Sequence, residues 1–234
     1  MNHPQTDSTN ATRRQGTGRR SWHAAGWPAL PLLAAAAALF GYGLTAPAPP
    51  PQPDPAQALT SAVPDPGVTG EDVTPWVSAL PPAAPIRVVI PAIGVDAPLV
   101  PLTLLPDQHL GAPPANIPRA AGWYADGTPP GTPGTAVIAG HVDTDAGPAV
   151  FYNLGALKKG MTIAVPRADQ TTAVFTIDAV AAYSATNFPT HTVYDPARRP
   201  ELRLITCGAG YSRTRHSYLG NVVVYAHLTS HSPA

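Results

Sequence analysis

Short apolar runs rich in β-branched residues recur along this chain from residue 86 onward. Most of them are bounded by Gly, Pro, Asp or Asn, a pattern that is typical of β-strands separated by turns. The six clearest runs cover residues 86–90, 135–140, 161–165, 173–183, 202–206 and 221–227. They predict an all-β domain over residues 85–234, either a barrel or a sandwich.

One segment has the spacing of a helix instead. Val150, Leu154 and Leu157 recur at positions i, i+4 and i+7, which predicts a short helix over residues 149–157. The sequence contains no internal repeat and no glycine-rich phosphate loop. Its 20 glycines are scattered through expected turns, a distribution that favours a β-rich chain over nucleotide binding.

The 31 prolines among 234 residues are about two and a half times the usual frequency of roughly 5%. They concentrate in residues 46–84, a stretch rich in Pro and Ala. This composition favours extended polyproline II structure and offers little apolar surface to offset the entropy of ordering. We therefore predict a disordered linker over residues 46–84.

Before the linker, residues 26–44 form a run with no charged side chain. As a helix that rises 1.5 Å per residue, the run would span about 28 Å, close to the roughly 30 Å hydrocarbon core of a bilayer. Trp22, Trp27 and Tyr42 lie near its ends, where interfacial aromatic residues are common. We predict a transmembrane helix over residues 23–45.

Charge on the two flanks of this span predicts its orientation. Four arginines occur within residues 13–20, whereas the other flank carries no charge until Asp54. The positive-inside rule then makes residues 1–22 a cytoplasmic basic tail and places the rest of the chain outside a single-pass cell-membrane anchor. A cleaved secretory signal is the alternative, although the apolar run exceeds the usual signal core of about 7–15 residues.

Charged residues make up only 12% of the chain, and 14 basic and 14 acidic side chains cancel. This balance provides no basic surface for nucleic acid, so nucleic-acid partners are not expected. Cys207 is the single cysteine, which excludes an intramolecular disulfide and a cysteine-rich zinc site. A lone cysteine is either a buried structural thiol or a nucleophile.

The context of Cys207 favours the nucleophile. The residue follows an apolar strand and precedes the flexible sequence Gly-Ala-Gly, a placement that exposes a thiol on a rigid support. Positive neighbours stabilise a thiolate, and Arg203, Arg213 and Arg215 all lie close in sequence.

His141 also follows an apolar strand, next to a polar turn that contains Asp143 and Asp145. Because imidazole titrates near neutral pH, His141 can take the proton of Cys207 and later give a proton to a leaving amine. One histidine and one turn supply too few ligands for a metal ion. Neither a metal nor another cofactor is predicted.

The segment that ends in Cys207, Leu204-Ile-Thr-Cys207, matches the LxTC signature of sortases, and Ala139-Gly140-His141 resembles their strand-borne histidine. The order also fits, since the histidine precedes the cysteine by 66 residues (207 − 141). Residues 122–124, 148–152 and 221–226 are similar to actinobacterial sortases of class F, or class E. The resemblance covers residues 86–228.

This resemblance implies a closed eight-stranded β-barrel with short helices. It also implies a cysteine transpeptidase that cleaves an LPxTG-like sorting signal between Thr and Gly. The Cys207 thioester would then pass its acyl group to a cell-wall amine or a pilin lysine, and no cofactor would take part.

Sortases also use an arginine that binds substrate and stabilises the developing oxyanion. In many of them this arginine begins the last strand, where the present sequence has Asn221. The resemblance to class F favours Arg213 for the role, and Arg215 and Arg203 remain alternatives.

Two other functions stay open at this point. A secreted cysteine hydrolase, such as a cell-wall peptidase, would pass the thioester to water; such enzymes commonly place cysteine before histidine, at a helix start. A non-catalytic anchored binding module would retain the barrel without the reaction.

Overall fold

The computed structural model describes residues 48–59 and 77–233. The predicted transmembrane helix over residues 23–45 and the basic tail before it lie outside these ranges. Within the described ranges, no helix combines the length and the apolar character needed to cross a membrane.

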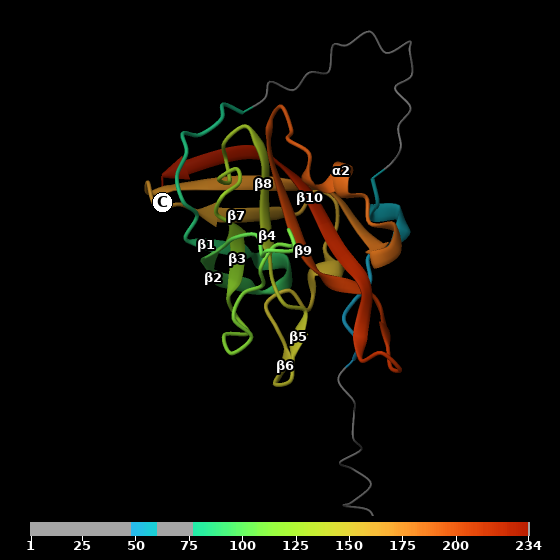
Figure 1. The fold of residues 1–234 in the computed structure, drawn as a ribbon. Helices are drawn as coiled ribbons and strands as arrows, with labels where there is room; N and C mark the ends of the chain where they lie inside the picture. Colours follow the sequence, from blue (N-terminus) through green and yellow to red (C-terminus); the bar gives the residue numbers. More distant parts are fainter. Residues whose placement is uncertain (1–47, 60–76, 234) are drawn as a thin grey trace, which may run out of the picture. The chain divides into compact units, whose positions relative to one another are not determined.

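Eight strands close into a barrel, as the resemblance implied (Figure 1). The order around the barrel is β1-β2-β3-β4-β9-β10-β8-β7, and the pairs β2–β3 and β4–β9 run parallel. A separate hairpin pairs β5 (Asp143–Thr144) with β6 (Gly147–Pro148). The barrel strands are β1 (Arg87–Ile90), β2 (Val95–Leu102), β3 (Ala121–Tyr124), β4 (Gly134–Ala139), β7 (Thr162–Pro166), β8 (Thr171–Ser184), β9 (Pro200–Ser212) and β10 (Ser217–Pro233).

Each of the six predicted runs lies in a barrel strand to within one residue at its ends, but β2 and β3 were not predicted. β2 contains Pro98 and Pro101, and proline is normally confined to strand edges because it lacks an amide hydrogen. In the structure, β2 accommodates both prolines because it changes its pairing strand partway along its length. Residues 95–98 pair with β1, and residues 99–102 pair with β3, so each half of β2 is hydrogen-bonded along one side.

The predicted helix over residues 149–157 is wrong. Only the 3₁₀ turn η3 (Leu154–Ala156) forms there, because backbone amides of this segment donate to distant carbonyl groups. The amide of Ala149 donates to Val142 and that of Phe151 donates to His141, at N···O distances of 2.9 and 3.0 Å. The segment is therefore tied to the loop after β4. The remaining short helical elements are η1 (Pro55–Gln57), η2 (Pro91–Ile93), η4 (Ala185–Asn187) and α2 (Thr190–Tyr194).

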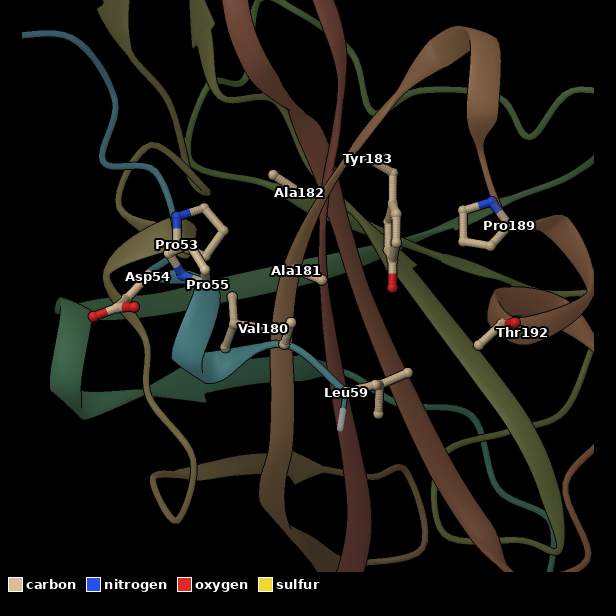
Figure 2. A pocket seen from close by; sticks show the side chains of 11 residues that line it. Pro53, Asp54, Pro55, Leu59, Val180, Ala181, Ala182, Tyr183, Pro189 and Thr192 are labelled. Atoms are coloured by element: carbon tan, nitrogen blue, oxygen red, sulfur yellow. The ribbon is translucent and has the colours of Figure 1, made fainter. Parts of the chain in front are cut away.

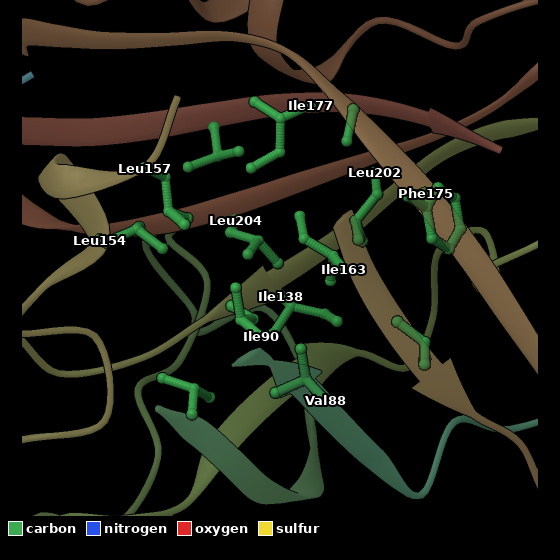
Figure 3. Close-up of a cluster of buried hydrophobic side chains, with 14 of the residues drawn as sticks. Val88, Ile90, Ile138, Leu154, Leu157, Ile163, Phe175, Ile177, Leu202 and Leu204 are labelled. Atoms are coloured by element: carbon green, nitrogen blue, oxygen red, sulfur yellow. The ribbon is translucent and has the colours of Figure 1, made fainter. Parts of the chain in front are cut away.

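Aliphatic side chains from opposite walls fill the barrel interior, as Figure 3 shows for Ile90, Ile138, Ile163 and Leu204. Side chains alternate along a strand, so their neighbours in sequence face outward. An outer apolar cluster results on β4, β9, β10 and β8, and α2 covers part of it. Its buried members are Val137, Ala179, Ala181, Val193, Ile205, Val223 and Tyr225.

Two described stretches of the predicted linker are ordered against the barrel, so disorder does not extend over all of residues 46–84. The Gln57 side-chain oxygen accepts a hydrogen bond from the Lys159 amide at 2.8 Å. Leu80 is buried, and its amide donates to Gly131 at 2.8 Å. Residues 60–76 lie outside the described ranges. Apolar side chains within a proline-rich segment thus find partners that composition alone does not reveal.

Candidate active site

The parallel pairing of β4 with β9 brings two strand ends to the same level. Ala139 lies opposite Ile205 in this ladder. Two residues further along, His141 lies just beyond the end of β4, and Cys207 lies within β9 at the same end of the barrel. Neighbouring strands lie about 4.8 Å apart, and residues level with each other in a ladder share a face. The fold therefore brings His141 and Cys207, 66 positions apart in sequence, to the same end of the β4–β9 pair.

Hydrogen bonds fasten the end of β4 to β9 next to this pair. The Gly140 amide donates to the Ile205 carbonyl at 3.1 Å, and the Thr206 hydroxyl donates to the Gly140 carbonyl at 2.8 Å. Gly140 also has no room for a side chain, since a Cβ atom there would lie 2.6 Å from the buried Phe151 ring. Glycine before His141 is thus required by close packing.

Cys207 is exposed to solvent and is the only cysteine of the chain. Surrounding groups still remove part of its hydration, and this desolvation, followed by the negative charge of Asp143, raises the pKa of the thiol. The expected stabilisation of a thiolate by arginines is not what the site provides. Because the thiol form is favoured near neutral pH, the cysteine needs a base.

His141 is half-buried, and its Nε2 atom lies 2.7 Å from the carbonyl oxygen of Pro113. A carbonyl oxygen only accepts hydrogen bonds, so this partner assigns the hydrogen to Nε2. The neutral ring then carries its lone pair on Nδ1. Pro113 therefore fixes both the tautomer and the orientation of the imidazole, and leaves Nδ1 as its basic atom.

The chain bends directly after Cys207. Ala209 and Gly210 on β9 oppose the single residue Leu219 on β10, a two-against-one pairing that makes a β-bulge. Both residues have left-handed backbone angles, with φ values of 56° and 90°. The bulge re-aims the hairpin tip formed by β9 and β10, which projects from the barrel at the same end as the β5–β6 hairpin (Figure 1).

A contact between these two hairpins places Tyr218 beside the thiol. The Tyr218 hydroxyl donates a hydrogen bond to Oδ2 of Asp143. The ring of Tyr211 packs edge-on against the Tyr218 ring with centroids 5.2 Å apart. Desolvation and this hydrogen bond raise the pKa of Tyr218 far above its ordinary value, so the hydroxyl stays protonated. The sequence pattern around Asp143 raised only the question of a metal ligand, and no sequence signal pointed to Tyr218.

The three candidate arginines lie in different places. Arg203 shares the outward face with Cys207 but is buried; its guanidinium donates to Glu201 at 2.7 Å and stacks over the Tyr225 ring at 4.7 Å. Arg213 and Arg215 occupy the exposed turn at the hairpin tip. Arg213 lies six positions after Cys207, just past the end of β9, so at most about 20 Å of extended chain separates the two residues.

Asn221 occupies the position on the last strand where many sortases have the arginine. It pairs directly with Cys207 across the β9–β10 ladder. Its Nδ2 atom lies 3.4 Å from the Thr206 carbonyl, a long hydrogen bond that leaves the amide largely available to another acceptor.

The exposed Cys207 lies on the surface of the barrel and not in an enclosed cavity. A cavity of about 530 Å³ lies elsewhere, between residues 53–59 and β8, and is lined by Pro53, Leu59 and Tyr183 among others (Figure 2). Cys207 and His141 do not line it. Within the part of the chain that the structure describes, no three His, Cys, Asp or Glu side chains gather to hold a metal ion.

Comparison with known proteins identifies the family. A sequence model described as a sortase domain matches residues 88–229, more than half of the chain. This chain therefore belongs to the sortase family. As a sortase it is an enzyme, a cysteine transpeptidase.

Solved structures of sortases are similar to this chain at low identity. Listeria monocytogenes sortase A is 18% identical with a TM-score of 0.49, and a mutant of Streptomyces avermitilis sortase E is 24% identical with a TM-score of 0.46. In both cases the match covers 64% of this chain and 91% of the other. Corynebacterium diphtheriae sortase A is 20% identical with a TM-score of 0.48, over 64% of this chain and 62% of that one. No curated protein matches this sequence.

Proposed function

We propose that this sortase cleaves an LPxTG-like sorting signal between Thr and Gly and transfers the acyl group to a cell-wall amine or a pilin lysine. The observation that supports the proposal is the parallel pairing of β4 with β9, which brings His141, just after β4, and the exposed Cys207, within β9, to the same end of the barrel. We further propose that residues 23–45 anchor the enzyme in the cell membrane with its barrel outside, as a class F or class E sortase.

The first half-reaction uses His141 as base and then as acid. Nδ1 of His141 takes the proton of the Cys207 thiol, and the sulfur attacks the carbonyl carbon of the signal's threonine. A C–S bond forms, the C–N bond to glycine breaks, and the imidazolium returns its proton to the departing amine. The Pro113 carbonyl supports both steps because it holds the ring through Nε2.

The second half-reaction reverses these roles. An acceptor amine attacks the thioester, the C–N bond of the product forms, and the sulfur of Cys207 leaves. Splitting one amide exchange into two acyl transfers lowers the individual barriers. An acceptor that reaches the thioester before water does gives transfer in place of hydrolysis.

We propose Arg213 as the group that stabilises the oxyanion, with Arg215 and Arg203 as alternatives. In support, the bulge at Ala209 and Gly210 bends the hairpin that carries Arg213 and Arg215. Arg203 fits less well because Glu201 already neutralises it.

The two turn arginines provide matched variants for a test. Removing an oxyanion donor costs about a hundredfold to a thousandfold in kcat. Arg213→Ala should show a loss of this size in peptide cleavage, whereas Arg215→Ala should change the rate by only a few-fold. A large loss of cleavage rate in Arg215→Ala alone would instead assign the stabilisation of the oxyanion to Arg215.

The function itself is tested with the full chain in detergent and a fluorogenic LPxTG-like peptide. Cleavage is expected in the wild type and none in Cys207→Ala. Added triglycine should appear in the product as a peptide conjugate. If the signal is cleaved but the acyl group goes only to water despite triglycine, the second candidate function, a cysteine hydrolase, replaces transfer.

A further inference from the structure

In the part of the chain that the structure describes, a carboxylate without a cationic partner is linked to the strand next to Cys207: Asp143 is hydrogen-bonded to Tyr218 on β10, the strand that pairs with β9 at Cys207. Asp143 lies two residues after His141, on β5, and its charge is close enough to raise the pKa of Cys207. Throughout residues 48–59 and 77–233, no Lys, Arg or His side chain forms an ion pair with Asp143. By contrast, other acidic side chains near the barrel ends, such as Asp169 and Glu201, are paired with arginines.

The carboxylate is held in one orientation. Its Oδ2 atom accepts the hydrogen bond of the Tyr218 hydroxyl, and Tyr218 is braced by the Tyr211 ring. Tyr218 uses only Oδ2, so Oδ1 is a second acceptor atom of the same carboxylate. The arrangement joins the β5–β6 hairpin to the β9–β10 hairpin beside the nucleophile, which places a fixed acceptor group at the reaction centre.

For the first half-reaction this carboxylate is unfavourable. A negative charge near Cys207 opposes formation of the thiolate that must attack the signal. Once the thioester has formed, the sulfur is uncharged and the repulsion disappears. The next reactant is an amine, which is a cation at neutral pH. Asp143 then offers the complementary charge at the place where this amine must arrive.

We propose that Asp143, oriented by Tyr218, binds the ammonium group of the acceptor amine. The inference rests on the proposed transfer function and names the group that captures its second substrate. The site fits one chemical class of acceptor, a primary ammonium group. The source of this group would be a free N-terminal glycine, a diaminopimelate side chain or a lysine.

The ammonium that is paired with Asp143 loses one proton to water and becomes a nucleophilic amine. Its nitrogen attacks the thioester carbonyl, the C–N bond forms and the C–S bond breaks. The second proton of the nitrogen passes to Nδ1 of His141 and from there to the Cys207 sulfur, which restores the thiol. The free enzyme and the amide are the products.

The test compares two acceptors in the full chain and in Asp143→Asn. Triglycine presents an ammonium at neutral pH, whereas hydroxylamine is an uncharged nucleophile there. We expect Asp143→Asn to raise the KM for triglycine by about tenfold, as for loss of a charged hydrogen bond. The KM for hydroxylamine should stay within about twofold, and the rate of thioester formation should not fall.

Asp145→Asn is the matched control. Asp145 is an exposed carboxylate in the same hairpin turn and makes no hydrogen bond to Tyr218. It should leave both KM values unchanged, while Tyr218→Phe should raise the KM for triglycine by less than Asp143→Asn does.

An unchanged KM for triglycine in Asp143→Asn, or equal rises for both acceptors, would overturn the inference. These outcomes differ from failure of the proposed function, which would appear as absence of a Cys207 thioester in the wild type. A thioester that forms normally and accepts triglycine equally well in both proteins rejects only the role of Asp143.

Discussion

Asn221 lies directly opposite Cys207 across the β9–β10 ladder. Facing residues in an antiparallel pair share one side of the sheet, so the carboxamide and the thiol project together. The Asn221 amide therefore stands where a donor could reach an oxyanion formed at the sulfur.

Replacing Asn221 by alanine should lower kcat/KM for an LPxTG-like peptide by about tenfold or more, because a transition-state donor is lost. Thermal unfolding should change little, since the side chain makes only one long hydrogen bond. Steady-state cleavage assays and a melting curve measure the two effects. Wild-type kinetics in Asn221→Ala would show that the carboxamide takes no part.

Thr206→Val tests the fastening of the two strand ends. The Thr206 hydroxyl is buried and bonds the Gly140 carbonyl next to His141. Valine keeps the volume but leaves a buried carbonyl unpaired, at a cost of about 1–3 kcal/mol in the free energy of unfolding. The rate of peptide cleavage should fall by more than the loss of folded protein explains, because the imidazole is no longer held in position relative to the thiol.

Thr135→Val is the control for Thr206→Val. Thr135 is also buried on β4, but its hydroxyl donates to the Asp195 carbonyl and accepts from the Ala197 amide, at the other end of the strand. Denaturant unfolding should show a loss of stability in both variants, at least as large in Thr135→Val, and cleavage should fall only in Thr206→Val. Equal losses of cleavage would mean that general stability alone explains the effect.

Cys207 should react slowly with iodoacetamide at neutral pH, because desolvation and Asp143 raise the pKa of its thiol. The reaction rate should rise with pH, and the pH at which it reaches half of its maximum should lie above that of an ordinary thiol. Asp143→Asn removes the repelling charge, so its midpoint should move to lower pH and its rate at neutral pH should increase. A midpoint that is already low in the wild type would contradict this electrostatic account.

Gly155→Ala probes the ordered segment at residues 49–59. A Cβ atom at position 155 would lie 2.0 Å from the Pro51 carbonyl oxygen, a contact that the backbone cannot accept. The segment should separate from the barrel, with faster hydrogen exchange at the amides of Ala56 and Gln57. Cleavage should remain near the wild-type rate, and unchanged exchange would argue against the docked arrangement.

Local sequence predicts the strands whose side chains are buried on the barrel wall. The runs over residues 135–140 and 202–206 combine β-branched residues with bounding turns, and both became core strands. β2 escaped prediction because Pro98 and Pro101 are compatible with a strand only when pairing changes partway along it. That condition depends on the tertiary arrangement.

The site is predictable to a similar extent. Motif resemblance singled out Cys207 and His141, and their catalytic roles stay a prediction. The fold brings both residues to the same end of the β4–β9 pair. The contact between Tyr218 and Asp143 joins residues 75 positions apart through a bulge at Ala209, and no local pattern encodes such an approach. Likewise, only the structure reveals that the Pro113 carbonyl determines which nitrogen of His141 is basic.

The most direct test of the central claim is mass spectrometry of the full chain after rapid acid quenching with an LPxTG-like peptide. We expect a mass increase equal to the peptide truncated after threonine, located on the fragment that contains Cys207. The adduct should be removed by hydroxylamine and absent in Cys207→Ala. No adduct, or one carried by another residue, would contradict the claim that Cys207 and His141 together form an acyl-enzyme.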